Sequence, residues 1–259
     1  MSINKEEYIE SMRRLEFSDE TKGKMIGNLT KISTPGNGGV MKKGIKAGKA
    51  VIIAAACVMI FGVTAAAAGI ATMTVSHNRL GSRTDNFEKL SKLEKEIGFD
   101  VVAKESFSNG YMFDYMEIQD MVSKDDNYND VEKSSGMSIN YTKEGSPDVS
   151  IYMDPSTSDF GVKNAQESRE VNGITLYYSY DEYLFLPASD GESATEEEIK
   201  RQETDPHFNI SYGSDERETS FVSSVFFIMD GVTYDLMSFD TNMTSEEMLD
   251  MAEEIINAR

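Results

Sequence analysis

The residue types that most often carry catalysis or bind metals are scarce in this chain. His77 and His207 are the only histidines, and Cys57 is the only cysteine. Cys57 lies in a long uncharged run, so the sequence offers neither a Cys–His pair nor a His-rich zinc site elsewhere. A Ser–His–Asp triad would need His207, which follows Asp205-Pro206 in a turn-like stretch without a nucleophile-elbow motif. We expect no catalytic residue, no metal site and no cofactor, and a protein that is not an enzyme.

Acidic residues are abundant, but only one stretch has a spacing that suggests a site. Residues 125–130, Asp-Asp-Asn-Tyr-Asn-Asp, open like the Asp-x-Asn-x-Asn pattern of a calcium loop. In such a loop Gly makes the sharp turn where Asp130 stands, and a bidentate Glu binds where Gly136 stands. The sequence has neither of these required residues, so it does not match a calcium loop. The alternatives that remain are a weak cation site and a solvated loop.

Charge is distributed unevenly along the chain, whose formal net charge is -20. Residues 1–49 carry 10 Lys or Arg and 6 Asp or Glu, a formal charge of +4. Residues 77–259 carry 15 and 39, a formal charge of -24. An acidic domain of this kind lacks the basic face that phosphates need, so we expect no nucleic-acid partner.

The two parts are separated by residues 50–76, which contain no Asp, Glu, Lys or Arg. As a helix this run would reach roughly 40 Å, more than the ~30 Å hydrocarbon core of a bilayer. We predict a transmembrane helix over 50–76, with the lipid bilayer as its partner. The alternatives are a buried core helix, a cleaved signal peptide and a lipoprotein signal at Cys57. The run has no polar face, which disfavours a buried core helix. It begins far from the N-terminus, which disfavours a cleaved signal peptide, and it continues well beyond Cys57, which disfavours a lipoprotein signal.

The charges that flank this run predict its orientation. Only Arg79 and Arg83 follow it before Asp85, whereas four lysines precede it. The positive-inside rule then places the N-terminus in the cytoplasm and the C-terminal domain outside, as a single-pass protein of the cell membrane. Small-residue pairs in the run would allow a weak transmembrane homodimer. The four lysines are Lys42, Lys43, Lys46 and Lys49, and the pairs are Gly62/Ala66 and Ala65/Gly69.

The N-terminal segment, residues 1–34, contains two short amphipathic helical patterns, and residues 35–49 form a basic linker. Short helices of this kind are marginal in water, so their apolar stripes are predicted to bind each other or a cytoplasmic partner. The alternative is a loosely ordered tail. The stripe residues that we predict to bind a partner are Tyr8, Ile9, Met12, Leu15, Met25, Ile26 and Leu29.

The outer part, residues 77–259, has the patterns of an α+β domain. Helical spacing predicts a helix over 86–98, and Thr244-Ser245-Glu246-Glu247 is a capping box that opens a C-terminal helix. Asn172-Gly173 and Asp230-Gly231 each lie between apolar-polar alternations, which indicates two-residue hairpins. We predict an antiparallel sheet with N- and C-terminal helices. Further strands are expected at 101–102, 111–118, 137–141 and 149–153, and a solvated loop or short helix is expected over 189–206.

Aromatic residues cluster after the first predicted hairpin. A sheet core and the lining of an apolar groove would both need such residues, and the sequence leaves both interpretations open. The cluster consists of Tyr177, Tyr178, Tyr180, Tyr183 and Phe185.

Residues 107–113, 211–216, 230–236 and 244–248 resemble a largely uncharacterised extracytoplasmic domain family of Gram-positive single-pass membrane proteins of the anti-sigma-factor type. The resemblance implies that the cytoplasmic helices bind a sigma factor or another cytoplasmic regulator while the outer domain senses envelope conditions. It brings no catalytic residues, and the chain lacks the His and Cys residues of the zinc-binding anti-sigma class. The alternative is a membrane-anchored binding module for a lipid, a peptide or a cell-wall ligand.

Overall fold

The structure is a computed structural model that describes residues 58–59, 64–66, 69–71, 73–124, 130–155, 162, 165–187, 193–214 and 216–259. The two predicted cytoplasmic helices and the basic linker lie outside these residues, as does most of the acidic stretch 125–130. The predicted residues that therefore lie outside the described ranges are Tyr8, Ile9, Met12, Leu15, Met25, Ile26, Leu29, Lys42, Lys43, Lys46 and Lys49.

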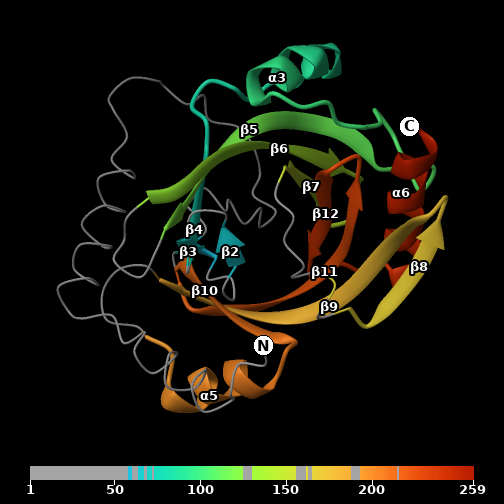
Figure 1. Cartoon of the computed structure of the whole chain (residues 1–259). Helices are drawn as coiled ribbons and strands as arrows, with labels where there is room; N and C mark the ends of the chain where they lie inside the picture. The colour runs from blue at the N-terminus through green and yellow to red at the C-terminus, as the bar shows by residue number, and fades with distance from the viewer. Residues whose placement is uncertain are drawn as a thin grey trace, which may run out of the picture.

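The described chain forms a curled sheet with helices around it, a half-barrel of the α+β class (Figure 1). The main strands are β1 (Val58–Met59), β4 (Met73–Asn78), β5 (Met112–Lys124), β6 (Asp130–Thr142), β7 (Val149–Asp154), β8 (Glu167–Val171), β9 (Ile174–Pro187), β10 (Phe208–Ser214), β11 (Glu218–Met229) and β12 (Val232–Phe239). Their order across the sheet is β10-β1-β4-β5-β6-β7-β12-β11-β9-β8. The predicted strands at 111–118, 137–141 and 149–153 are confirmed as parts of β5, β6 and β7.

Short strands lie within the run that the sequence assigns to a membrane helix. They are β1, the paired β2 (Thr64–Ala66) and β3 (Gly69–Ala71), and β4, which includes Ser76. Among the residues that the structure describes, none of the helices has the length and apolar character needed to cross a bilayer. The rest of 50–76 lies outside the described residues, so the membrane helix stays a prediction.

Both predicted two-residue hairpins are confirmed. Asn172 and Gly173 have φ values of 51° and 80°, and Asp230 and Gly231 have φ values of 54° and 79°. Positive φ at both central residues is what a type I′ turn requires, and it explains the choice of Asn-Gly and Asp-Gly. The turns join β8 to β9 and β11 to β12 in antiparallel register.

One strand pair departs from the antiparallel sheet that the sequence predicts. β9 and β10 run parallel, because the chain between them crosses over through α5 (Glu196–Thr204). A crossover helix of this kind brings the next strand back in the same direction. The short helix expected within 189–206 is therefore present, and it is the connection that makes this pair parallel.

The two predicted terminal helices are confirmed. Phe87–Lys89 form the 3-10 turn η1, which continues into α3 (Leu90–Ile97) and ends at Gly98 with φ 89°. α6 (Ser245–Asn257) follows a complete capping box at Thr244. Its buried side chains join the core formed by β5–β7, β9, β11 and β12, and they are Met248, Leu249, Met251, Ala252, Ile255 and Ile256.

The strand predicted at 101–102 is wrong. The Val101 N–H donates to the Glu94 side chain (3.0 Å) and the Val102 N–H donates to the Tyr234 hydroxyl (2.8 Å). Side chains thus satisfy these two amides, and no neighbouring strand is needed to do so.

Replacing Thr244 by alanine is expected to lower the free energy of unfolding by about 1 kcal/mol. The Thr244 hydroxyl accepts from the Glu247 N–H, while Glu247 accepts from the Thr244 N–H. Thr195 makes the same box on α5, a helix without a buried residue, so Thr195→Ala is the matched control. Urea unfolding should detect a loss for Thr244→Ala and almost none for Thr195→Ala; equal losses would contradict this account.

Candidate functional site

The sheet has two chemically different faces. Alternate residues of a strand point to opposite faces, so a row of paired residues across the strands shares one face. The row Met116, Ile139, Ile151, Leu236, Val225 and Tyr178 is buried in the core. The rows on either side of it are polar and aromatic except for Met237. They are Glu117, Ser138, Tyr152, Asp235, Phe226 and Tyr177, and Tyr115, Asn140, Ser150, Met237, Ser224 and Ser179.

The curl of the sheet decides which face is covered. In Figure 1, α3, α5 and α6 all lie on the outside of the curl. The apolar rows pack against α3 and α6, and a second small core made by Leu184, Leu186, Ala194, Phe208 and Ile210 lies near α5. The polar rows therefore lie on the concave side, where Figure 1 also places β2, β3 and β4, and many of their residues are buried. This side is the candidate site.

A hydrogen-bond network on the concave face is centred on Asp181 of β9. Asp181 is almost fully buried (4% exposed). One carboxylate oxygen lies 2.7 Å from the His207 Nδ1 atom, and the other accepts from the Ser179 hydroxyl at 2.9 Å. The Ser179 hydroxyl also lies 2.9 Å from that of Ser224. The network joins β9, β11 and the turn before β10, and it fixes the orientation of His207.

This network does not form a nucleophilic triad. In a triad the imidazole contacts the serine and takes its proton. Here the Ser179 hydroxyl and His207 Nδ1 both contact Asp181, so the carboxylate lies between them. Over the described part of the chain, His, Cys, Asp and Glu side chains form no group of three that could hold a metal ion. The side chains of the network hold one another in a fixed hydrogen-bonding pattern.

Asp235 of β12 is the most unusual group on this face. Its Oδ1 atom is buried and has no hydrogen-bond partner. Burial, and then the negative charges of Asp154 and Asp181, raise the pKa of this carboxyl to about 7. Burial also raises the pKa of the neighbouring Tyr183 hydroxyl, and the charges of Asp181 and Asp235 add to that effect. A carboxyl of this kind lacks a donor that would complete its hydrogen bonding.

A second group of contacts fixes the β5 end of the concave face. The Asn78 side chain donates to Glu117 at 2.9 Å, and the Arg83 guanidinium lies 3.4 Å from the centre of the Tyr115 ring. Burial raises the pKa of Glu117, and the positive charge of Arg83 opposes this shift. The Arg83 guanidinium is thus already in contact with an aromatic ring.

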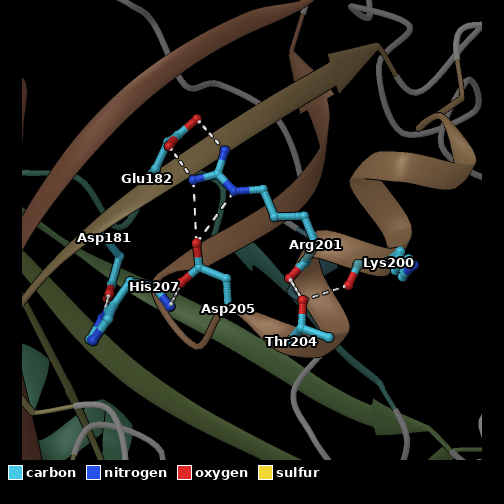
Figure 2. Close-up of polar contacts among 7 residues, drawn as sticks. All are labelled: Asp181, Glu182, Lys200, Arg201, Thr204, Asp205 and His207. Atoms are coloured by element: carbon cyan, nitrogen blue, oxygen red, sulfur yellow. Dashed lines mark hydrogen bonds and ion pairs between the residues drawn. The ribbon is translucent and has the colours of Figure 1, made fainter.

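Figure 2 shows how α5 is connected to the network of Asp181. Glu182 follows Asp181 in β9 and points to the opposite, convex face, where Arg201 of α5 donates to both of its oxygens at 3.0 and 2.6 Å. Arg201 also donates to Asp205 at 3.3 Å, and Asp205 accepts from the His207 N–H at 3.0 Å. The turn that carries His207 is therefore attached to α5 by side chains.

Replacing Arg201 by lysine is expected to loosen α5 and the turn without unfolding the sheet. Lysine keeps the charge but cannot make the two-point contact with Glu182. Hydrogen exchange of the amides in 195–207 should accelerate, and the ring signals of His207 in NMR spectra should shift. Lys200→Arg on the same helix is the control, and equal changes in both variants would show that Arg201 does not position the turn.

In the structure the residues of the aromatic cluster lie on both faces of the sheet. Tyr178 lies in the core, as the first interpretation expects. Tyr177, Tyr183 and Phe185 share the opposite face with Ser179 and Asp181 by their register in β9. Tyr180 is on the convex side, exposed, and stacks on Phe221 with ring centres 5.4 Å apart.

The residues that the sequence assigned to partner binding or topology lie outside the described residues. The residues that the sequence did not assign are Ser179, Asp181, His207, Asn209, Ser224 and Asp235. The signal that the sequence contained was the set of polar residues that alternate with apolar ones along each strand. Such residues ordinarily indicate the solvent-facing side of a sheet.

Comparison with protein-family models, curated proteins and solved structures finds no match.

Proposed function

We propose that this chain is a membrane-anchored binding module whose concave sheet face holds a ligand, and that binding there is relayed to its cytoplasmic segment. The observation that carries the proposal is that the helices of the described chain cover the convex face while polar and aromatic rows line the concave one. Binding sites are concave and combine apolar walls with a few placed polar groups. Buried polar atoms without partners, Asp235 Oδ1 and Asn209 Nδ2, add unmet hydrogen-bonding capacity.

The anchor in this proposal is the uncharged run 50–76, with the N-terminus in the cytoplasm and the domain outside. Its support is the run's length and the opposite charges of the segments on its two sides. A membrane helix over 50–76 excludes the pairings of β1, β2 and β3 and those of residues 73–76 in β4, so an experiment decides between them. We expect the full chain to stay with membranes after alkaline carbonate extraction; release into the supernatant would contradict the anchor and leave the binding face to be tested alone.

For the cytoplasmic segment we propose a sigma factor or another cytoplasmic regulator as partner. The support is the pair of apolar stripes over 1–34 and the resemblance to anti-sigma-factor-type membrane proteins. The test compares proteins that co-purify with the full chain and with a form lacking residues 2–34. A sigma factor recovered only with the full chain is expected; the same partners in both forms would leave the binding module without this regulatory output.

The concave face is tested by filling it. Replacing Ser224 by tryptophan puts a large side chain in the middle of this face, whereas Thr219→Trp places the same side chain on the exposed convex side of β11. We expect molecules that co-purify with the full chain from native membranes, detected by mass spectrometry, to be lost only in Ser224→Trp. Thermal unfolding of each variant distinguishes lost binding from lost folding. If a folded Ser224→Trp variant still carried the co-purifying molecules, the proposal would be contradicted.

A further inference from the structure

The connection between β4 and α3 begins with a tight turn that has an apolar tip. The Ser82 N–H donates to the Arg79 carbonyl oxygen at 3.1 Å, and Gly81 within the turn has φ 80°. The turn is attached to β5, because the Arg79 N–H donates to the Ile118 carbonyl oxygen at 2.7 Å and the Ile118 N–H donates to the Ser82 hydroxyl at 3.0 Å. Leu80 lies at the tip and is fully exposed. A single exposed leucine is common on protein surfaces, so its surroundings decide whether it has a role.

Basic side chains surround this turn. A cavity of about 160 Å³ lies between the turn and α3, and Glu96 is the one acidic residue in its lining. Asp85 and Glu88 of the same connection are exposed and lie outside this lining. Since a water molecule takes about 30 Å³ in the liquid, the cavity has room for a phosphate group. The cationic residues that line it are Arg79, Arg83, Lys89 and Lys92.

Two of these cations have carboxylate partners within the fold. The Arg79 guanidinium donates to both oxygens of Asp120 at 3.0 and 2.5 Å, so its charge is used there. The Lys92 Nζ atom lies 3.6 Å from a Glu96 carboxylate oxygen. Both side chains of this second pair are exposed to solvent, where such contacts contribute little. Lys92 is therefore available to an external anion, whereas Arg79 is not.

Arg83 and Lys89 supply further positive charge. The Arg83 guanidinium stacks on the Tyr115 ring, with 3.4 Å to the ring centre, and a guanidinium stacked by its face keeps N–H donors at its edge. Its charge also acts on Glu117. Lys89 is exposed at the end of η1. The cavity thus offers donors and positive charge, in a domain whose residues 77–259 have a formal charge of -24.

The proposed anchor determines where this cavity lies. The uncharged run 50–76 ends three residues before Arg79. An extended chain advances at most about 3.6 Å per residue, so the turn lies within about 11 Å of the end of a membrane helix over 50–76. Anionic lipid headgroups at a bilayer surface attract lysine and arginine, and exposed apolar side chains enter the boundary between headgroups and acyl chains. The cations of the cavity and Leu80 at the tip fit these two parts of a lipid surface.

We propose that the cavity between the turn 79–82 and α3 binds the phosphate of an anionic phospholipid headgroup, with Arg83, Lys89 and Lys92 as donors and Leu80 among the lipids. This inference rests on the membrane anchor of the proposed function and does not depend on a ligand of the concave face. The same lipids repel the acidic remainder of the domain. The contact therefore fixes which end of the domain faces the membrane.

The test uses the full chain in nanodiscs with a fluorescent label at the tip of the turn. Cys57 is the only cysteine, so Cys57→Ser combined with Leu80→Cys gives one position for the fluorophore NBD. The nanodiscs contain phosphatidylcholine with a nitroxide on its headgroup, which quenches a label at the lipid surface. We expect quenching at 80 to increase with the fraction of phosphatidylglycerol, an anionic phospholipid.

A label elsewhere on the domain is the control for position. Ile199 of α5 is also an exposed apolar residue, so Ile199→Cys replaces Leu80→Cys in a second protein. We expect little quenching at 199 at any fraction of phosphatidylglycerol. Equal quenching at 80 and 199 would show that the turn is not the part of the domain that meets the lipid, and would overturn the inference.

Two matched double variants locate the headgroup. Lys89→Gln with Lys92→Gln should raise the phosphatidylglycerol fraction at half-maximal quenching at least about fivefold, because each lysine near an anionic surface strengthens the attraction. Lys143→Gln with Lys200→Gln removes the same charge from other exposed positions and should change this fraction less than about twofold. Equal shifts would show a general effect of charge and contradict the proposed site.

The remaining outcomes distinguish this inference from its alternatives. If inorganic phosphate changes the fluorescence at 80 in phosphatidylcholine nanodiscs as much as phosphatidylglycerol does, the cavity binds free phosphate and the lipid assignment is wrong. A chain that resists carbonate extraction but shows no dependence on phosphatidylglycerol at 80 contradicts this inference alone. Release by carbonate contradicts the anchor of the proposed function as well. Thermal unfolding of each variant shows that folded proteins are compared.

Discussion

Replacing Asp235 by asparagine is expected to stabilise the protein at pH 8 and to remove much of the pH dependence of its stability above pH 4. In the folded state burial and the charges of Asp154 and Asp181 raise the pKa of Asp235 from 3.8 to about 7. Between these values the folded state holds a proton that the unfolded chain has released. The stability due to this proton is complete below pH 4 and is lost as the pH rises through about 7.

The expected size of this effect follows from the linkage between proton binding and folding. One proton changes the free energy of unfolding by about 1.4 kcal/mol per pH unit, so the wild-type protein should lose a few kcal/mol over this range. Asparagine has almost the same shape and no charge. Urea unfolding from pH 4 to pH 8 measures the profile, with Glu203→Gln as control. A wild-type profile that is flat or rises between pH 5 and pH 7.5 would contradict the buried position of Asp235.

The second large effect concerns the other face of the sheet. Phe227 is completely buried, and its ring stacks on that of Tyr234 with centres 4.8 Å apart. Phe227→Ala is expected to lower the free energy of unfolding by about 3–5 kcal/mol, because it leaves a cavity in the core. This is a large share of the about 5–15 kcal/mol typical of a folded domain.

The adjacent residue provides the matched control. Ile228 is 40% exposed and lies on the concave side of β11. Ile228→Ala should change the free energy of unfolding by less than about 1 kcal/mol. Urea unfolding of both variants tests the assignment of the two faces directly. Similar losses for both variants, or a larger loss for Ile228→Ala, would mean that the two faces have been exchanged.

The elements that follow from local chemistry could be predicted from the sequence. Asn172-Gly173 and Asp230-Gly231 supply the positive φ that their turns need, and Thr244 supplies both parts of its helix cap with Glu247. These features depend on residues a few positions apart. They are readable because the physical requirement and the residues that meet it lie in one short stretch.

The candidate site could not be predicted, because it depends on contacts between distant strands. Asp181 and Asp235 are far apart in the sequence, and they act on one another because β9 and β12 both pair with β11 in the sheet. The parallel register of β10, set by the crossover through α5, brings His207 to Asp181. From the sequence, each of these residues is an ordinary polar position in an alternating strand. The direction of curl decides that their common face is the concave one.

The measurement that tests the central claim most directly is photo-crosslinking from the concave face in intact cells. A photoreactive amino acid replaces Met237, in the middle of this face, and in a separate protein Thr219, exposed on the convex side. After irradiation, mass spectrometry identifies what is attached at each position. The account predicts a molecule other than the chain itself attached at 237 and none at 219. Adducts at 237 that contain only the chain's own residues, or the same adduct at both positions, would contradict it.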